Sequence, residues 1–85
     1  MARQIYVNGA YLPEAEARIS VMDRGFLFGD AIYEVTAMIG GHLIDNDLHL
    51  SRLEQSLAKI GIPMPLSLDG IREVQAELVR RNGMT

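Results

Sequence analysis

The sequence predicts an α+β domain in which a small antiparallel sheet is followed by two helices. Up to about residue 43, apolar side chains recur at every second position in short stretches, which is typical of strands. From residue 46 onward they recur at intervals of three and four, which is typical of helices. Because strands precede helices instead of alternating with them, the pattern indicates α+β architecture.

The first element expected is a hairpin over residues 4–12, "QIYVNGAYL". Ile5 and Val7 alternate with polar neighbours, and Asn8-Gly9 suits a two-residue type I′ turn. Pro13 limits the second strand or places it at a sheet edge.

Two connecting stretches follow the hairpin. In "EAEARISVMD", Ile19 and Val21 alternate with polar residues and suggest a short extended piece. The next run, "DRGFLFGD" at residues 23–30, is expected to be a loop. It matches neither the G-x-x-x-x-G-K-[ST] nor the G-x-G-x-x-G phosphate-binding pattern, so it is no phosphate loop by sequence.

Residues 31–39 again show the alternation of a strand, with two sets of side chains on opposite faces. One face carries Ala31, Tyr33, Val35 and Ala37, and the other carries Ile32, Glu34, Thr36 and Met38. Gly40-Gly41 makes a tight turn, and "HLI" returns as a partner strand.

The first helix is expected to begin with Asp45 or Asn46 as its cap and to end before Gly61. Its apolar stripe consists of Leu50, Leu53, Leu57 and Ile60, and its neighbouring polar face of His49, Arg52, Ser56 and Lys59.

The second helix is expected to start at Ser67 or Asp69 and to end at Gly83. The side chains predicted to face inward are Leu68, Ile71, Val74 and Leu78.

Composition excludes several classes of function. The net charge is −3 and the basic residues are scattered, with only Arg80 and Arg81 adjacent, which argues against a nucleic-acid surface. No apolar run approaches the ~18 residues that a membrane-spanning helix needs, and no signal peptide is visible. The chain has no cysteine, so it forms neither disulfides nor thiolate metal sites, which suits a cytoplasmic protein.

Two residues are candidates for binding a ligand. Arg52, on the rim of the first helix's apolar stripe, can present a planar cationic fork to a phosphate or carboxylate. Spacing alone favours a solvated arginine paired with Glu54 or an upstream aspartate. Tyr33 has small neighbours on its face, so its phenol could meet a ligand, although a packed tyrosine with a surface hydroxyl fits the same pattern.

Other polar groups are weaker candidates. His42, Asp45, Asp47 and His49 are metal-ligating types, but capping and the helix dipole already explain the two aspartates. We therefore assign no metal site. Asp23, Asp30 and Glu34 are too loosely arranged to be read as a catalytic carboxylate pair.

Taken in order, "IYVNGAYLPEAEARIS", "DRGFLFGDAIYEV", the two-glycine turn and "HLSRLEQSLAKIGI" resemble the N-terminal domain of the fold-type IV, or class IV, pyridoxal-phosphate aminotransferases. The likeness is greatest to the D-amino acid aminotransferases and extends over essentially all 85 residues. It implies a pyridoxal 5′-phosphate enzyme that acts on a small amino acid and a 2-oxo acid, and a homodimer.

The resemblance also implies roles for the two candidate residues. The arginine of "H-x-x-R-L" in this family binds the cofactor's 5′-phosphate, and it corresponds to Arg52. The tyrosine of "D-x-x-Y-E-V" lines the substrate pocket and helps to hold the substrate carboxylate in the D-amino acid enzymes, and it corresponds to Tyr33.

The chain departs from the D-amino acid enzymes at Ala37, where they tend to have a basic residue. Branched-chain aminotransferases usually have glycine where this chain has Val35, and aminodeoxychorismate lyases of the family usually lack the tyrosine. D-amino acid specificity is therefore favoured, with these two activities as alternatives.

The lysine that carries the cofactor in this family has no counterpart in the sequence. The only lysine, Lys59, matches an ordinary helix position. We therefore expect residues 1–85 to be the N-terminal small domain of a larger aminotransferase, inactive by itself. The alternative from another class is a free-standing, non-catalytic α+β module that binds itself or a partner.

Overall fold

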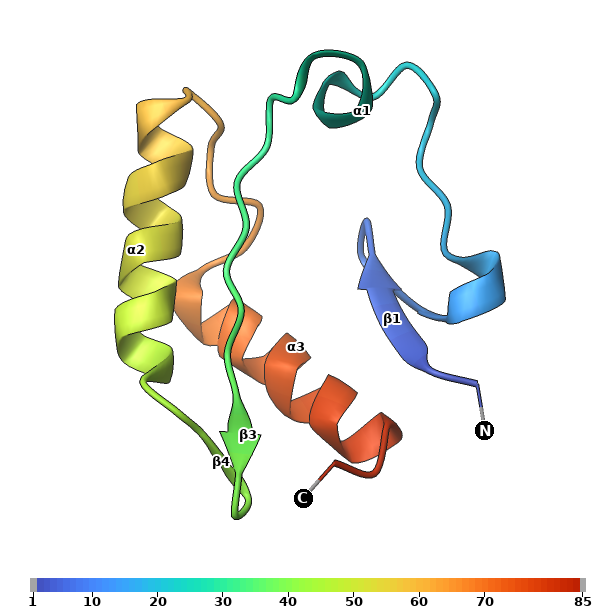
Figure 1. Ribbon diagram of the computed structural model, residues 1–85, viewed down its shortest axis with the longest axis vertical. Coiled ribbons are helices and arrows are strands. Elements are labelled where there is room, and N and C mark those ends of the chain that lie inside the picture. The colour runs from blue at the N-terminus through green and yellow to red at the C-terminus, as the bar shows by residue number, and fades with distance from the viewer. Residues whose placement is uncertain (1, 85) are drawn as a thin grey trace.

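The computed structural model describes residues 2–84 and confirms the predicted α+β order, with strands first and two long helices last (Figure 1). The elements are β1 (Gln4–Val7), β2 (Ala10–Pro13), the 3-10 helix η1 (Glu14–Glu16), α1 (Arg24–Phe28), β3 (Met38–Ile39), β4 (His42–Leu43), α2 (Asn46–Lys59) and α3 (Leu68–Arg81).

The N-terminal hairpin forms as expected. Strands β1 and β2 pair antiparallel, and both turn residues have positive φ, 49° at Asn8 and 88° at Gly9, as a type I′ turn requires. Tyr6 and Tyr11 are cross-strand partners whose rings meet edge to face with centroids 5.0 Å apart.

The prediction for residues 14–30 was wrong in two places. Ile19 and Val21 lie in irregular, exposed backbone, because no neighbouring strand in the described chain pairs with this stretch. The run expected to be a loop contains the short helix α1, whose first turn is stabilised by the Asp23 carboxylate accepting a hydrogen bond from the Gly25 amide. Gly29, at φ 71°, then ends this helix in the left-handed conformation.

The strand predicted over residues 31–39 is paired only at its end. Strand β3 pairs with β4 through Met38–Leu43 and Ile39–His42, across the expected turn at Gly40-Gly41. Residues 30–37, called the extended segment below, keep the predicted alternation of exposed and partly buried side chains. They form no ladder, because no second strand of the described residues lies beside them.

Helix α2 contains the best-buried side chains of the chain, Leu50 at 3% exposed and Leu57 at 9%. The predicted side-chain cap at its start is absent: Asp45 takes a left-handed conformation and its carboxylate accepts no capping hydrogen bond. Its C-terminus ends as predicted, since Gly61 has φ 72° and the Ile62 amide donates to the Leu57 carbonyl. Ile60, expected in the apolar stripe, is 45% exposed.

Helix α3 starts at the expected cap, where the Ser67 hydroxyl accepts from the Gly70 amide. It is tied to α2 by a pair of reciprocal amide hydrogen bonds between Asn46 and Gln75, both 2.9 Å. At its other end the Asn82 amide donates to the Gln4 carbonyl and accepts from the Gln4 amide, which fixes β1 against the helix.

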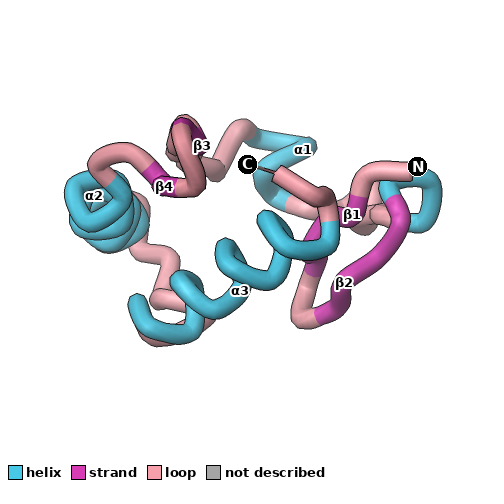
Figure 2. The backbone as a smooth tube through the Cα atoms, turned by 90° about the horizontal axis from the view of Figure 1, so that it is seen from below, coloured by secondary structure: helices cyan, strands magenta, loops and turns pink. Residues whose placement is uncertain are grey.

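The molecule is thin, with extents of 36 × 30 × 18 Å, and Figure 2 shows α2 at one end of the backbone, the β1–β2 hairpin at the other and α3 between them. Two layers at most fit into 18 Å, so few side chains can be enclosed. No helix within residues 2–84 is long and apolar enough to cross a membrane.

Candidate functional site

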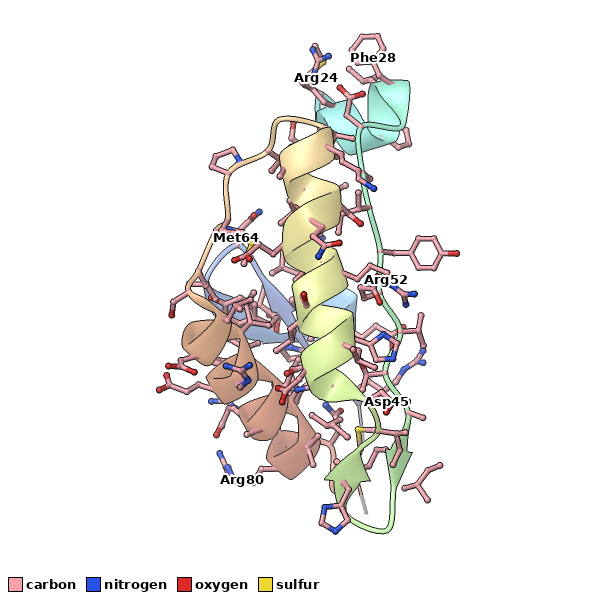
Figure 3. The ribbon with its side chains drawn as sticks, turned by 90° about the vertical axis from the view of Figure 1, so that its left-hand side faces the viewer. Arg24, Phe28, Asp45, Arg52, Met64 and Arg80 are labelled. Carbon is pink, nitrogen blue, oxygen red and sulfur yellow. The ribbon has the colours of Figure 1, made fainter. Side chains whose placement is uncertain are left out.

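The extended segment and α2 are joined by a cluster of three charged or polar side chains. Glu34 points toward α2, where one of its oxygens accepts from Arg52 Nε at 2.8 Å and the other from Arg52 Nη2 at 2.8 Å. His49, one turn earlier on α2, places Nδ1 2.7 Å from the same carboxylate. Figure 3 shows Arg52 reaching from α2 toward the extended segment.

The burial of the three side chains differs. Glu34 is 14% exposed and His49 is 21% exposed, whereas Arg52 is 64% exposed. The carboxylate is therefore the enclosed member of the cluster, and the guanidinium is its accessible end.

The hydrogen-bond donors can be assigned from chemistry. An ionised carboxylate only accepts, so His49 Nδ1 must carry the proton that it shares with Glu34. A protonated Nδ1 cannot accept from Arg52 Nη2, which lies 3.4 Å away. The guanidinium thus uses only its Nε and Nη2 edge within the cluster, and Nη1 has no acceptor among residues 2–84. Arg52 can still bind a second anion through that free end.

The ion pair shifts the titration of both partners. Hydrogen bonds from Arg52, and then from His49, lower the pKa of Glu34 from its ordinary 4.5 to about 2. The bond to Glu34 in turn raises the pKa of Arg52. Both groups are therefore charged at neutral pH.

Arg52 lines a surface hollow of about 440 Å³. Its lining comes from the start and middle of α2 and consists of Asp45, Leu48, His49, Ser51, Arg52 and Gln55. The hollow is open to solvent, and an arginine and a histidine on its wall suit an anionic ligand.

Tyr33 does not line this hollow. Successive side chains of an extended backbone point to opposite faces, so Tyr33 faces away from the helix that Glu34 contacts. Its side chain is 83% exposed, as is that of Val35 at 74% on the same face.

The residues first considered as metal ligands are dispersed. His49 is bonded to Glu34, Asp47 pairs with Arg72 at 3.1 Å, and His42 lies exposed on β4. Within residues 2–84 no group of three or more histidine or carboxylate side chains is arranged to hold a metal ion.

Comparison with known proteins identifies the family. The family model for class IV aminotransferases matches residues 31–85, more than half of the chain. The chain belongs to the class IV aminotransferases. It is similar to the D-alanine aminotransferases of Listeria monocytogenes (33% identical over 81 residues), Staphylococcus aureus (34% over 79) and Bacillus licheniformis (36% over 84). These alignments cover 93–95% of the chain but only 28–30% of each relative.

In this class IV aminotransferase chain, sequence reasoning found Arg52 but missed its two supports. Glu34 was expected to lie on the same face as Ile32 and Thr36, and in the structure this face is the partly buried one. A glutamate on the inward face of an extended stretch needs a cation opposite it. His49 and Arg52, three positions apart on one helix face, were the available partners, and that combination was the signal.

Proposed function

We propose that residues 1–85 form the N-terminal domain of a pyridoxal 5′-phosphate aminotransferase that transfers an amino group from a D-amino acid to a 2-oxo acid. The family assignment and the D-alanine aminotransferase names of the relatives support this proposal. The observation that carries it is Arg52, whose guanidinium is held by Glu34 at one edge and free at the other, beside a solvent-open hollow.

Arg52 fits the cofactor's phosphate. Glu34 leaves the outer N–H groups of Nη1 and Nη2 free, and these can donate two parallel hydrogen bonds to phosphate oxygens, the geometry in which arginine binds such groups best. When bound, the cofactor supplies the electron sink that lets the amino group leave the amino acid. The contribution of this chain is to bind and orient the phosphate end.

We assign the substrate carboxylate to Tyr33, whose hydroxyl has no partner among the described residues. A phenol donates one hydrogen bond and suits a carboxylate oxygen. Tyr33→Phe tests this role, because it removes the hydroxyl alone.

The chain does not supply the lysine that the proposed reaction needs. Lys59, its single lysine, is exposed in the last turn of α2, where it favours the helix C-terminus. It is separated by about two turns of helix from Arg52, and nothing encloses it. We therefore propose that residues 1–85 are inactive without the remainder of the protein, since the alignment covers only 28% of such a relative.

The remaining proposals concern the oligomeric state, the location and the partners of the enzyme. We propose a homodimer located in the cytoplasm, with small-molecule amino acids and 2-oxo acids as its partners, and neither nucleic acid nor membrane. The family resemblance supports the dimer, and the lack of cysteine suits a reducing compartment. Sedimentation of the purified protein tests the dimer.

The decisive experiment is substrate profiling of the protein that carries this chain. We expect a yellow protein that converts a D-amino acid and 2-oxoglutarate to a 2-oxo acid and D-glutamate. Preference for branched-chain L-amino acids would favour the branched-chain alternative, and release of pyruvate from aminodeoxychorismate would favour the lyase. A colourless protein without any of these activities would refute the proposal.

A further inference from the structure

We infer that Glu34 and His49 are positioning residues for Arg52: Glu34 fixes the guanidinium so that its Nη1 end faces outward, and His49 fixes Glu34. The inference rests on the proposed function, in which Arg52 binds the cofactor's phosphate. It adds two residues to the site. Both oxygens of Glu34 already accept hydrogen bonds from Arg52 and His49, so Glu34 acts through Arg52 and does not bind the phosphate itself.

Glu34 has the geometry of a support. Two parallel hydrogen bonds to Nε and Nη2 fix both the position and the plane of the guanidinium, which one bond could not do. Arginine has a long side chain that loses much rotamer freedom when it binds a ligand. Because Arg52 is 64% exposed and little else packs on it, Glu34 restricts that freedom before a ligand arrives.

His49 has the geometry of the second support. It is less exposed than Arg52, it lies on the same face of α2 one turn earlier, and its Nδ1–H donates to the Glu34 oxygen that also accepts from Arg52 Nη2. The carboxylate is thereby held from two directions. Asp45, which lines the same hollow, is the other charged group near this ring.

Charge and positioning predict opposite effects of removing Glu34 on phosphate binding. Glu34 carries a negative charge next to the proposed anion site, so its removal should strengthen phosphate binding if charge were the only effect. Positioning predicts weaker binding, because Arg52 would have to be ordered at the moment of binding. Whether removal of Glu34 raises or lowers the affinity for phosphate therefore distinguishes the charge effect from the positioning effect.

The experiment measures binding of pyridoxal 5′-phosphate and of pyridoxal, which lacks the phosphate, to the cofactor-free protein by equilibrium dialysis. Glu34→Gln should weaken binding of the phosphate form about tenfold, the size expected when an arginine's rotamer freedom must be lost on binding, and should leave pyridoxal unchanged. Glu54→Gln, which removes the same charge from an exposed site on α2, is the matched control and should change neither.

His49 is tested separately, so that the positioning inference can still be tested if the Glu34 variant folds poorly. His49→Ala should weaken binding of the phosphate form, and His49→Asn should restore most of it, because the asparagine amide nitrogen can take the place of Nδ1. Equal affinities of the Ala and Asn variants would overturn the role of His49. Unchanged or tighter binding by Glu34→Gln would overturn the role of Glu34.

Arg52→Ala distinguishes this inference from the proposed function. If it binds the phosphate form as the wild type does, the proposed phosphate site itself is wrong. If it binds weakly while Glu34→Gln binds normally, the phosphate site stands and the positioning inference fails.

Discussion

Two neighbouring parts of the chain, α2 with α3 and the extended segment at residues 30–37, are built in different ways. The helices complete their own hydrogen bonds and share an amide pair between Asn46 and Gln75, and α2 carries the buried Leu50 and Leu57. The extended segment has no strand partner within the described chain, and its outward face is apolar and exposed. It is held against α2 by the Glu34 cluster.

The comparison shows where local sequence suffices and where it does not. A helix satisfies its backbone from within, so an apolar stripe and end caps are enough to specify it. A strand satisfies its backbone only through another strand, so its alternation specifies faces but not pairing. The side chains that bridge the two parts, Glu34 and Arg52, are the proposed functional ones.

The largest effect is expected in the helical part. Leu50→Ala removes the most buried side chain of the chain and should lower the free energy of unfolding by about 2–5 kcal/mol. Leu48→Ala, on the same helix but 71% exposed, should change it by less than about 0.5 kcal/mol. Urea denaturation of the protein that carries this chain measures both. Similar losses for the two variants would mean that α2 buries a different face.

A smaller effect is expected where α3 joins the hairpin. Asn82→Ala removes both hydrogen bonds to the Gln4 backbone and should cost about 1–3 kcal/mol of unfolding free energy, since a partly buried donor and acceptor lose their partners. Hydrogen exchange of the Gln4 amide should accelerate at the same time. Glu73→Ala, at an exposed position of α3, is the control, and an unchanged exchange rate in Asn82→Ala would contradict the contact.

The smallest effect concerns pH, because the arginine partners involved are largely exposed. The pKa of Glu34 and that of Glu77 are both lowered from 4.5 to about 2 by neighbouring arginines. Their contribution to stability is therefore fully present above about pH 4.5 and is lost as the pH falls toward 2. Glu34→Gln should differ from the wild type in unfolding free energy above pH 5, and the difference should shrink on acidification.

Glu77 sharpens this comparison between the two parts. It pairs with Arg80 and Arg81 on its own helix, whereas Glu34 bridges the extended segment to α2. Glu77→Gln should show the same pH window without any change in cofactor binding. A stability difference for Glu34→Gln that persists undiminished to pH 2 would contradict the ion pair.

Features that depend on local sequence could be predicted, whereas those that depend on a distant partner could not. The hairpin turn at Asn8-Gly9, the Ser67 cap and the Gly61 terminus are local features, and all three are confirmed. The five-residue helix α1 was missed because its aromatic and glycine content resembles a loop, although Asp23 is a good N-cap. The strand at residues 31–39 was overextended because pairing depends on a neighbour that alternation does not reveal.

In the candidate site, too, individual residues could be identified from the sequence, but a contact between distant segments could not. Arg52 and Tyr33 were identified from motifs, and their roles stay predictions. The bridge from Glu34 to Arg52 spans 18 positions of sequence, so neither segment shows it by itself, and only the two patterns taken together could have indicated it. The exposure of Tyr33 follows from the alternation that had placed Glu34 and Tyr33 on opposite faces.

The most direct measurement is the preference of the cofactor-free protein for pyridoxal 5′-phosphate over pyridoxal, compared between the wild type and Arg52→Ala. A charge-assisted arginine contact is worth about 1.5–3 kcal/mol, so the variant should lose about ten- to hundredfold of this preference. Such a loss, with pyridoxal binding unchanged, is the predicted result. An equal preference in both proteins would show that Arg52 does not bind the phosphate.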